Sequence, residues 1–377
     1  QIYDAYFNSC LKCQSVKIYY FSPVKTDVCI IGGGLAGLTA AIDLTQKGYQ
    51  VIVIEKDKYP KHKVCGEYVS NEVLEYFDKI KFPLADLNPV KIDHFKMSNI
   101  QGKTIEADLD LGGFGISRYK FDEALARYAE QCGAVIQIDT VQSIAFSVSA
   151  DHFTLSCKFA EPITAKQVIG AYGKRSKLDK QLNRDFINKR SPWIAFKAHY
   201  QLAEFPKANV ELHHFKNGYC GLSKTENGHI NFCYLAHKKV FDAYQNVADF
   251  NQQEVSKNPF LADFLQKAEP VFKRPLGIAQ IAFQQKPAIE DHVLMCGDTA
   301  GLIHPLCGNG MAMAIHSAKI AAECLDDHFK LGSSRDQLES NYQKAWDKIF
   351  RRRLKTGRIL QRLIVNENWN NFAFKLV

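Results

Sequence analysis

The sequence lacks the features that mark membrane-spanning, secreted or disulfide-stabilised proteins. None of its apolar runs is long enough for a membrane-spanning helix. The first 21 residues, QIYDAYFNSCLKCQSVKIYYF, contain no apolar signal-peptide core. Its eleven cysteines are an odd number without regular spacing, which excludes a disulfide scaffold and favours free thiols in a reducing compartment. The sequence therefore predicts a cytoplasmic protein.

Metal ligands and positive charge are also scarce over most of the chain. Cys10 and Cys13 form a CxxC pair, but no second pair of ligands is evident nearby, so we predict no metal site. The net charge is +8, and the segment from Asn341 to Val377 holds nine Lys or Arg against two acidic residues, a net of +7. Because the rest of the chain is nearly neutral, the charge predicts a basic tail and no nucleic-acid-binding surface.

What the sequence does contain is a complete β-α-β unit, DVCIIGGGLAGLTAAIDLTQKGYQVIVIEKD, from Asp27 to Asp57. Val28 to Ile31 predicts a buried strand, and Leu35 to Lys47 has helical periodicity that stops at Gly48. Val51 to Ile54 predicts a second strand. A chain of 377 residues is long enough for two domains, and this unit predicts that one of them is an α/β domain.

Three glycines at the turn of this unit have G-x-G-x-x-G spacing, and each has its own physical role. Gly32 permits a tight turn, Gly34 lets a pyrophosphate approach the backbone, and Gly37 allows the helix to pack closely on the strand. The N-terminus of the helix offers free N–H groups and a positive dipole end to phosphates. Glu55 ends the second strand, where a carboxylate accepts hydrogen bonds from ribose hydroxyls. We therefore predict a dinucleotide-binding site.

A second glycine-rich segment, GDTAGLIHPLCGNGMAMA, follows the apolar run HVLMC near the end of the chain. It resembles the second flavin motif of the para-hydroxybenzoate hydroxylase superfamily, which includes geranylgeranyl reductases, aromatic hydroxylases and flavin-dependent halogenases. The resemblance implies that Asp298 holds the ribityl chain of FAD. It also implies that the following turn and helix start lie against the isoalloxazine ring, through Pro305, Gly308, Gly310 and Met311. A helix N-terminus there would stabilise the negative charge of reduced flavin.

Three other segments resemble motifs of the same superfamily. KHKVCGEYVS, residues 61–70, resembles the segment that passes the flavin. GISRYKFDEALARYAEQCGA, residues 115–134, resembles a helix whose arginine, here Arg118, lies near the cofactor. VIGAYGKRS, residues 168–176, departs from its motif at Tyr172, where the family has an Asp near FAD and the route of the reducing nicotinamide. The resemblance implies FAD as cofactor and NAD(P)H as electron donor, and Tyr172 is the departure that bears on how this donor is used.

The predicted site residues come from all of these segments. Two are candidates for chemistry: Cys65, in the segment that passes the flavin, and His304, which is placed for general acid catalysis. His213 and His214 are neighbours on a predicted strand, so at most one of them faces a pocket. The predicted FAD-binding residues are Gly32, Gly34, Leu35, Ala36, Gly37, Glu55, Lys56, Lys63, Cys65, Arg118, Val141, Asp298, Pro305, Gly308, Gly310 and Met311.

The predicted fold class is α/β, with a Rossmann-like FAD-binding domain, an inserted antiparallel β-sheet substrate domain and a C-terminal helical segment. The substrate sheet is predicted from alternating apolar and polar residues in DHFKMSNI, KTIEADLDL, WIAFKAHYQL, NVELHHF and HINFCYLAH. Phe241 to Ala268 is predicted to be helical, with an interruption near Pro259. The predicted FAD-binding domain comprises 26–79, 113–176 and 291–330, the substrate domain 80–112 and 177–290, and the helical segment 335–377.

The flavin motifs leave three functions open. In the first, reduced FAD reacts with O₂ and a lipophilic or aromatic small molecule is hydroxylated or epoxidised. In the second, the flavin exchanges a hydride with a C=C bond, as in a geranylgeranyl-type reductase. The third is a flavin redox sensor without turnover. Halogenation is disfavoured because the W-x-W-x-I-P motif is absent and Trp193 stands alone. We predict an FAD-dependent oxidoreductase, with monooxygenation as its reaction.

The basic tail has its own pattern. Tyr342, Trp346, Ile349 and Phe350 recur at helical spacing, and the pattern continues beyond Gly357. Two interpretations stay open for the predicted helix. It could pack on the protein with its basic face in solvent, or it could cover the opening to a substrate site and also make peripheral contact with an anionic membrane.

Overall fold

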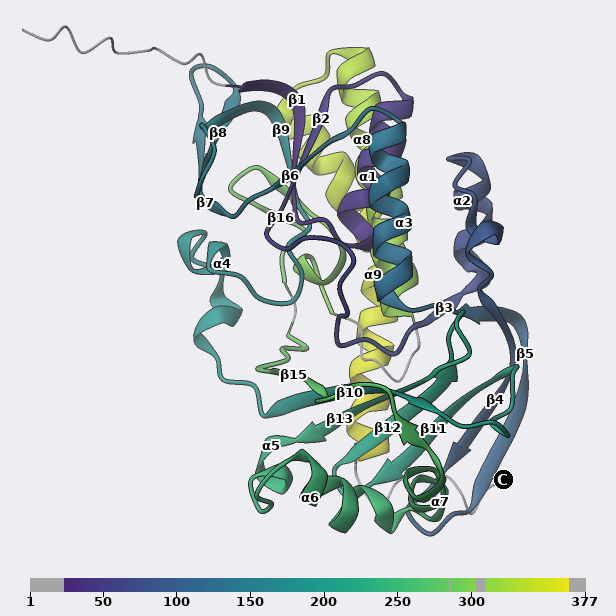
Figure 1. The fold of residues 1–377 in the computed structure, drawn as a ribbon. Helices are drawn as coiled ribbons and strands as arrows, with labels where there is room; N and C mark the ends of the chain where they lie inside the picture. Colours follow the sequence, from purple (N-terminus) through teal and green to yellow (C-terminus); the bar gives the residue numbers. More distant parts are fainter. Residues whose placement is uncertain (1–23, 285, 303–308, 366–377) are drawn as a thin grey trace, which may run out of the picture.

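The computed structural model describes residues 24–284, 286–302 and 309–365. Two β-sheets lie one above the other, and the chain passes between them several times (Figure 1). The first sheet carries long helices on one side, whereas the second carries short helices on the side away from the first (Figure 1). The predicted fold class, an α/β protein with a second sheet and helices at the C-terminal end, is confirmed.

The first sheet is built around the predicted β-α-β unit. β1 pairs in parallel with both β2 and β9, and β6 and β17 extend the parallel part. The strands β1 and β2 are buried almost throughout, as expected for parallel strands covered on both faces. The strands are β1 Val24–Ile31, β2 Val51–Glu55, β6 Val135–Ile138, β7 Val141–Ser147, β8 His152–Cys157, β9 Ile163–Gly170, β16 Ile289–Glu290 and β17 Val293–Met295.

Three helices cover one side of this sheet. α1 (Leu35–Gln46) contacts both α3 (Arg118–Gln131) and α8 (Gly310–Leu331). The chain leaves α1 through Gly48, whose φ of 92° lies in the left-handed region that glycine adopts without strain. The helix and strands predicted for this unit are thus present, with ends within a few residues of the expected ones.

The second sheet contains all five predicted strands and further ones that were not predicted, β12 among them. It is mixed rather than antiparallel, because β11 pairs in parallel with β4. Alternation within a strand reports which residues share a face, but it contains no information on strand direction. The strands are β3 Tyr68–Ser70, β4 Val90–Ser98, β5 Thr104–Gly115, β10 Trp193–Gln201, β11 Asn209–Phe215, β12 Gly218–Lys224, β13 Ile230–His237, β14 Glu269–Pro270 and β15 Leu276–Ala279.

The strands of the second sheet extend beyond the expected domain boundaries at residues 79/80 and 112/113. β3 pairs with β5, which runs on to Gly115, so residues 68–70 and 113–115 belong to the second sheet. The ring of Tyr68 lies over Gly113, where a Cβ would be 2.5 Å from it. Alternation of apolar and polar residues does not reveal that the ring of one strand lies over a glycine of its neighbour, so this pairing was not predicted.

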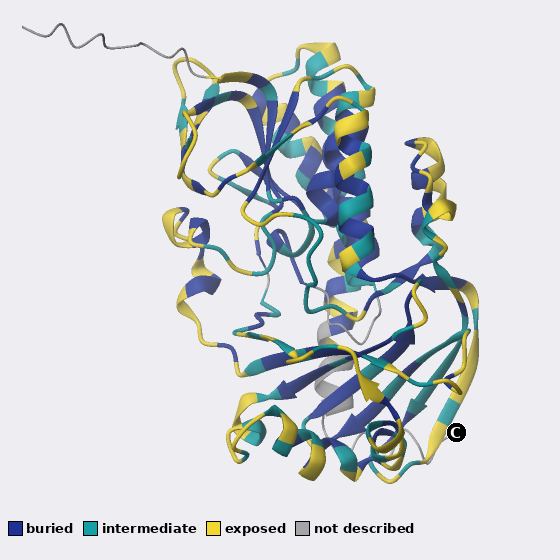
Figure 2. Cartoon of the chain, in the orientation of Figure 1, coloured by how far each residue is buried: buried dark blue, intermediate teal, exposed yellow. Residues whose placement is uncertain are grey.

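The two faces of the second sheet differ. The outer face packs an aromatic core that includes Phe232, Tyr234 and Phe250. Helices α5 (Lys238–Phe241), α6 (Val247–Gln253) and α7 (Pro259–Lys267) cover this face, and their exposed residues point away from it (Figure 2). The inner face turns toward the first sheet and carries both apolar and charged side chains.

The remaining helices are α2 (Leu74–Lys79), α4 (Leu178–Gln181) and α9 (Arg335–Val365). On α9, Tyr342, Trp346 and Phe350 are buried as predicted, whereas Ile349 is 37% exposed because it lies beside that stripe. Trp346 packs against Gly301 in the second glycine-rich segment. No helix in the described ranges has the length and apolar character needed to span a bilayer.

Candidate functional site

The glycine turn after β1 has a backbone that other residues would disrupt. Gly32 has φ of 107°, and a Cβ there would lie 2.4 Å from the carbonyl oxygen of Ala171. A Cβ on Gly37 would lie 1.9 Å from the carbonyl oxygen of Gly32. Real Cβ atoms do not make such contacts, so both positions require glycine. The turn therefore brings α1 as close to β1 as the backbone allows.

The N-terminus of α1 has no side-chain cap. Its N-cap, Gly34, has no side chain to accept a hydrogen bond, and the first turn contains no acidic residue. The first intrahelical bond runs from Leu38 N to Gly34 O at 2.9 Å. The N–H groups of Leu35, Ala36 and Gly37 therefore have no acceptor within the helix. Such a terminus combines N–H donors with the positive end of the helix dipole, which suits a phosphate.

Two cations face this terminus. A Cβ built on Gly34 would lie 3.6 Å from both Arg118 Nη2 and Lys63 Nζ. Asp122, fully buried, accepts hydrogen bonds from Arg118 Nε at 2.7 Å and Nη2 at 2.8 Å, and pairs with Lys63 at 2.8 Å. Burial alone would raise the pKa of Asp122, but Arg118 and Lys63 hold it below its usual range. The cluster has a net charge of +1, and this charge with the helix terminus fits a diphosphate.

Glu55 stands at the end of β2, where the sequence placed it, and already has three partners. Its Oε2 accepts a 2.7 Å hydrogen bond from Gly33 N. Its Oε1 accepts from Lys61 Nζ at 2.6 Å and from Asp57 N at 3.1 Å. The carboxylate therefore holds the backbone of the glycine turn through Gly33. A ribose hydroxyl that donates to Glu55 would share this carboxylate with the ammonium of Lys61. Of the other residues predicted for this end, Lys56 is exposed and Val141 is buried in the first core.

The second glycine-rich segment begins directly after β17. Asp298 lies in a 3-10 turn, Gly297–Thr299, and its carbonyl oxygen accepts a hydrogen bond from Lys286 Nζ at 2.8 Å. Burial lowers the pKa of Lys286 to about 8. Gly310 and the buried Met311 begin α8, as predicted. His304, Pro305 and Gly308 lie outside the described residues.

The departure at Tyr172 is accompanied by a carboxylate that sequence reasoning missed. Tyr172 Oη donates to Asp179 Oδ1 at 3.3 Å. Asp179 is 1% exposed, accepts from Ser176 N at 2.6 Å and pairs with Arg184 at 3.0 Å. Arg184 in turn donates to Thr299 O at 3.0 Å in the second glycine-rich segment. Position 172 lacks the aspartate of the family motif, but Asp179, seven positions later, places a carboxylate beside the Tyr172 hydroxyl.

The segment with Cys65 lies between the two sheets. Cys65 is half-buried, and its carbonyl oxygen accepts from Asn231 on β13 at 3.2 Å. The next acid along the chain, Glu67, is fully buried and pairs with Lys197 and with His199, both on β10. Glu67 lies within the quoted motif KHKVCGEYVS but was given no role, and Lys197 and His199 were missed. The only signal for these two was the alternation of β10, in which a polar face is ordinarily assigned to solvent.

Two histidines singled out in the sequence are structural in this arrangement. His213 is fully buried, with Nδ1 2.8 Å from Ser98 Oγ and Nε2 2.9 Å from Glu211 Oε2. His214 is also buried, and its Nδ1 lies 2.9 Å from Ser98 O. Both serve the packing of β4 against β11, away from the Cys65 segment.

Another part of the inner face is apolar and lies beside the Cys65 segment and the second glycine-rich segment. Four members of this group lie outside the strands of the second sheet: Ile281 and Phe283, which follow β15, Val64, next to Cys65, and Leu302, in the second glycine-rich segment. We call this group the inner apolar patch: Val64, Trp193, Ala195, Leu212, Tyr219, Leu235, Ile278, Ile281, Phe283 and Leu302.

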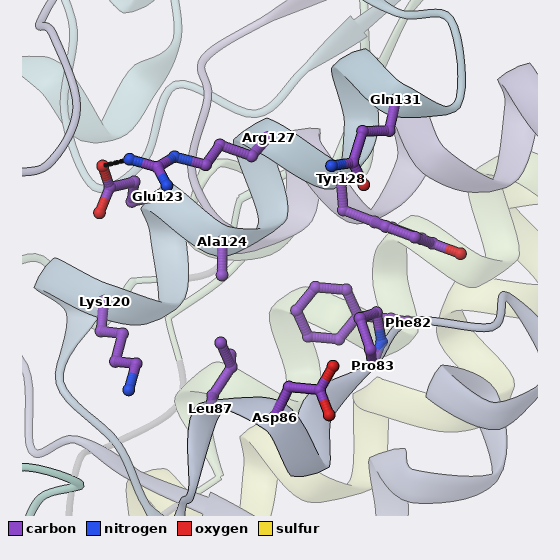
Figure 3. A pocket seen from close by; sticks show the side chains of 10 residues that line it. All are labelled: Phe82, Pro83, Asp86, Leu87, Lys120, Glu123, Ala124, Arg127, Tyr128 and Gln131. Atoms are coloured by element: carbon purple, nitrogen blue, oxygen red, sulfur yellow. Dashed lines mark hydrogen bonds and ion pairs between the residues drawn. The ribbon is translucent and has the colours of Figure 1, made fainter.

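A separate cavity of about 280 Å³ lies between α3 and the 3-10 turn Leu84–Leu87 (Figure 3). Lys120, Ala124 and Arg127 line it from α3, and Figure 3 shows Arg127 paired with Glu123. These residues occupy the opposite face of α3 from Arg118 and Asp122, because α-helical residues advance by 100°. The cavity is therefore not part of the cationic cluster.

Comparisons with known proteins agree with this geometry. Residues 25–349 match a family model described as FAD binding domain. Conditioned medium factor receptor 1 of Dictyostelium discoideum is 24% identical over 352 residues, covering 85% of this chain and 67% of that protein. Digeranylgeranylglycerophospholipid reductase 1 of Methanosphaera stadtmanae is 25% identical over 348 residues, covering 85% and 80%. The structure of PqsL, a probable FAD-dependent monooxygenase from Pseudomonas aeruginosa, has a TM-score of 0.75 at 14% identity, covering 93% and 100%.

Proposed function

The chain belongs to the family of FAD-binding domains and is an FAD-dependent oxidoreductase, and from this premise we propose that it oxygenates a lipophilic small molecule. Membership of the superfamily of para-hydroxybenzoate hydroxylase and geranylgeranyl reductases, predicted from four motifs, is confirmed. The cofactor is FAD. The reaction, the substrate class and the roles of single residues are the parts that we propose.

The inner apolar patch carries the proposal. It contains residues of three sequence-distant segments, and two of its members, Val64 and Leu302, belong to segments that the flavin motifs place beside the cofactor. Trp193 and Phe283 add aromatic surface, with ring centroids 6.4 Å apart. If FAD binds beside these segments, an apolar patch of buried and partly buried residues would favour a lipophilic or aromatic substrate and would keep water from the reacting atoms.

Residues of this chain would supply binding and orientation. FAD, when bound, supplies the redox chemistry and the reaction with O₂. Lys63, Arg118 and the N-terminus of α1 would hold its diphosphate, and Asp298 its ribityl chain. The patch around Ala195 and Leu235 would orient the substrate over the ring.

The reaction is tested by the fate of O₂. The purified holoprotein would be given NADPH or NADH, ¹⁸O₂ and a panel of long-chain phenols, quinols and polyenes, with products analysed by mass spectrometry. We expect one substrate class to stimulate O₂ uptake and to gain one ¹⁸O atom. O₂ uptake that yields only hydrogen peroxide for every substrate, with no labelled product, would contradict monooxygenation.

A pair of variants tests the binding surface. Ala195 belongs to the inner apolar patch, whereas Ala198, on the same strand, has the opposite parity and faces the outer core. Ala195→Leu should raise the KM for the best substrate about tenfold with FAD content unchanged. Ala198→Leu should lower stability and leave KM unchanged. Equal effects of both variants on KM would remove the patch from the substrate site.

A second reaction, reduction of a C=C bond, is favoured by one specific observation. The similarity to digeranylgeranylglycerophospholipid reductases extends over 85% of this chain. The two reactions separate under argon. A polyene that reoxidises the chemically reduced protein without O₂, and gains two hydrogen atoms, would assign reductase chemistry. Stable reduced protein with every substrate would exclude reductase chemistry.

We also propose NAD(P)H as the electron donor. Asp179 and the hydroxyl of Tyr172 supply a polar site where the family motif has a carboxylate. Anaerobic bleaching of the flavin by NADPH or NADH in stopped-flow mixing would support this donor. A flavin that dithionite reduces but neither nicotinamide reduces would exclude it and point to a partner reductase.

The last part of the proposal is contact of α9 with an anionic membrane. Lys344, Lys348, Arg351, Arg352 and Lys355 are exposed and lie on one stripe, opposite the buried side of the helix. Each basic residue near an anionic surface contributes about 1 kcal/mol, and salt screens the attraction. The holoprotein should sediment with anionic but not neutral vesicles, and less at high salt. No sedimentation at low salt would assign the stripe to solvent.

A further inference from the structure

Residues 63–67, here called the Cys65 loop, are held to the inner face of the second sheet by their own backbone. Three of the loop's carbonyl oxygens accept side-chain hydrogen bonds from three neighbouring strands. The donors face the loop together. Ser223 of β12 stands opposite Asn231 of β13, and Lys197 of β10 lies on the same face as His199, which also stands opposite Asn231. The bonds run from Lys197 Nζ to Lys63 O (3.2 Å), from Asn231 Nδ2 to Cys65 O (3.2 Å) and from Ser223 Oγ to Gly66 O (3.3 Å).

Glu67 adds an ionic connection at the end of this loop. Its side chain is fully buried and its φ of 54° is left-handed, a conformation that non-glycine residues hold only when their surroundings enforce it. One carboxylate oxygen pairs with Lys197 and accepts from Arg118 N at 2.6 Å, and the other lies 2.7 Å from His199 Nε2. Burial would raise the pKa of Glu67, but Lys197 and His199 keep it lowered, so the carboxylate is charged.

The opposite side of the same loop belongs to the phosphate-binding cluster. Lys63 pairs with Asp122 at 2.8 Å, and Asp122 holds the guanidinium of Arg118. Arg118 therefore contacts both ionic groups, with its backbone N–H on Glu67 and its side chain on Asp122. A displacement of the loop would move the two cations that face the N-terminus of α1.

A metal ion is the competing interpretation of this cluster. His62, Glu67 and His199 each place one ligand atom within 4.8 Å of the others. Burial, together with Lys197 and His199, lowers the pKa of His62 to about 4, so its ring is neutral at pH 7. The ammonium of Lys197 already neutralises Glu67, however, and a divalent cation would have to displace it against charge repulsion.

We propose that Lys197 and His199 are positioning residues of the FAD site, which act through Glu67 to fix the Cys65 loop and with it Lys63 and Arg118. Lys197 and His199 lie on the second sheet, whereas the glycine turn follows a strand of the first. The second sheet would thereby influence how tightly FAD is held. This inference rests on the FAD site proposed above and adds the residues that hold it in place.

The test separates the placement of the loop from stability. Lys197→Met and Glu67→Gln each leave a buried group without its partner, so both should unfold more easily. FAD should leave the diluted holoprotein about 10- to 100-fold faster in each, since small displacements of positioning groups have effects of this size. In Lys197→Met/Glu67→Gln no charge is left unpaired. Its unfolding midpoint should return toward wild type while FAD release stays fast.

A matched control is available on the same sheet. Glu211 is also a buried carboxylate paired with a histidine, His213, but it does not bond the Cys65 loop. Glu211→Gln should lower stability while FAD release changes by less than about twofold, as expected for a site with no shared partners. FAD release that follows stability alone in all four variants would overturn the proposal.

Two further outcomes are decisive. Stoichiometric binding of Zn²⁺ by the wild-type holoprotein, lost in His62→Phe, would overturn the proposal by assigning Glu67 to a metal. Wild-type protein that binds no FAD would overturn the FAD site and this inference together. Wild-type protein with bound FAD and unaltered release in Lys197→Met and Glu67→Gln would overturn the inference alone and leave the FAD site standing.

Discussion

The two sheets of this molecule use their side chains in different ways. In the first, β1 and β2 are mostly buried, and β1 ends in the glycine turn, where the backbone is the candidate binding surface. In the second, a single strand serves two environments: Ile194 and Phe196 of β10 pack in the outer core, whereas Lys197 and His199 bind a loop. Backbone N–H groups bind the pyrophosphate, which all dinucleotides contain. Side chains of a pocket determine which substrate fits.

The largest effect is expected where the two sheets meet, at Asp122. Asp122→Asn would leave Arg118 and Lys63 buried or half-buried without their counter-charge. Removal of one partner from a buried pair costs about 3–5 kcal/mol. We expect a loss of this size in urea unfolding, together with loss of FAD. Asp108, which pairs with His94 on the exposed edge of the second sheet, is the control: Asp108→Asn should cost less than about 1 kcal/mol.

The β-α-β unit of the first sheet was predictable because its pattern is local. Val28 to Ile31, the glycines and Val51 to Ile54 follow one another within 27 residues, and each element is explained by its own sequence. The second sheet was predictable only as strands. The parallel pairing of β11 with β4 joins segments more than 100 residues apart, so its direction depends on the path of the chain and not on alternation.

The next effect compares the same substitution on α1, which packs on the first sheet, and on β12 of the second sheet. In Gly37→Ala the new Cβ would meet the carbonyl oxygen of Gly32 at 1.9 Å. Alanine gains up to about 1 kcal/mol of helix propensity over glycine, yet overpacking costs about 1–3 kcal/mol or more, so a net loss is expected. In Gly221→Ala the new Cβ meets Leu212 at an ordinary 3.5 Å, and stability should change by less than about 0.5 kcal/mol. Urea unfolding of both variants measures the contrast, and equal losses would abolish it.

A smaller effect is expected from pH. Glu67 and Asp122 both have pKa values lowered by the folded state. The stability that they contribute is therefore present above their unfolded values, near pH 4, and is lost as pH falls through the lowered folded values. The free energy of unfolding should fall below about pH 4.5, and the decline should be shallower in Lys197→Met/Glu67→Gln. A decline of unchanged slope in that variant would show that Glu67 is not charged in the folded protein.

The sequence could propose some residues of the candidate site and not others. The glycine turn, Arg118 and Asp298 were proposed from motifs, because each motif is a continuous segment. Lys197 and His199 were not, because their partner Glu67 is 130 and 132 residues away in the sequence. A buried charge on a strand looks like a solvent-facing residue until its partner is located in space.

The smallest effect is expected on α9. One side of this helix is buried and the other is exposed. Phe350 is fully buried, whereas its neighbours Arg351 and Arg352 are exposed. Arg351→Ala/Arg352→Ala should change the free energy of unfolding by less than about 0.5 kcal/mol, because exposed charges contribute little to stability. The same variant should lose sedimentation with anionic vesicles if the basic stripe contacts a membrane, since two charges near such a surface contribute about 2 kcal/mol. Unchanged stability with unchanged vesicle binding would assign the contact elsewhere, and a large loss of stability would mean that these arginines belong to the packing of α9 and not to its surface.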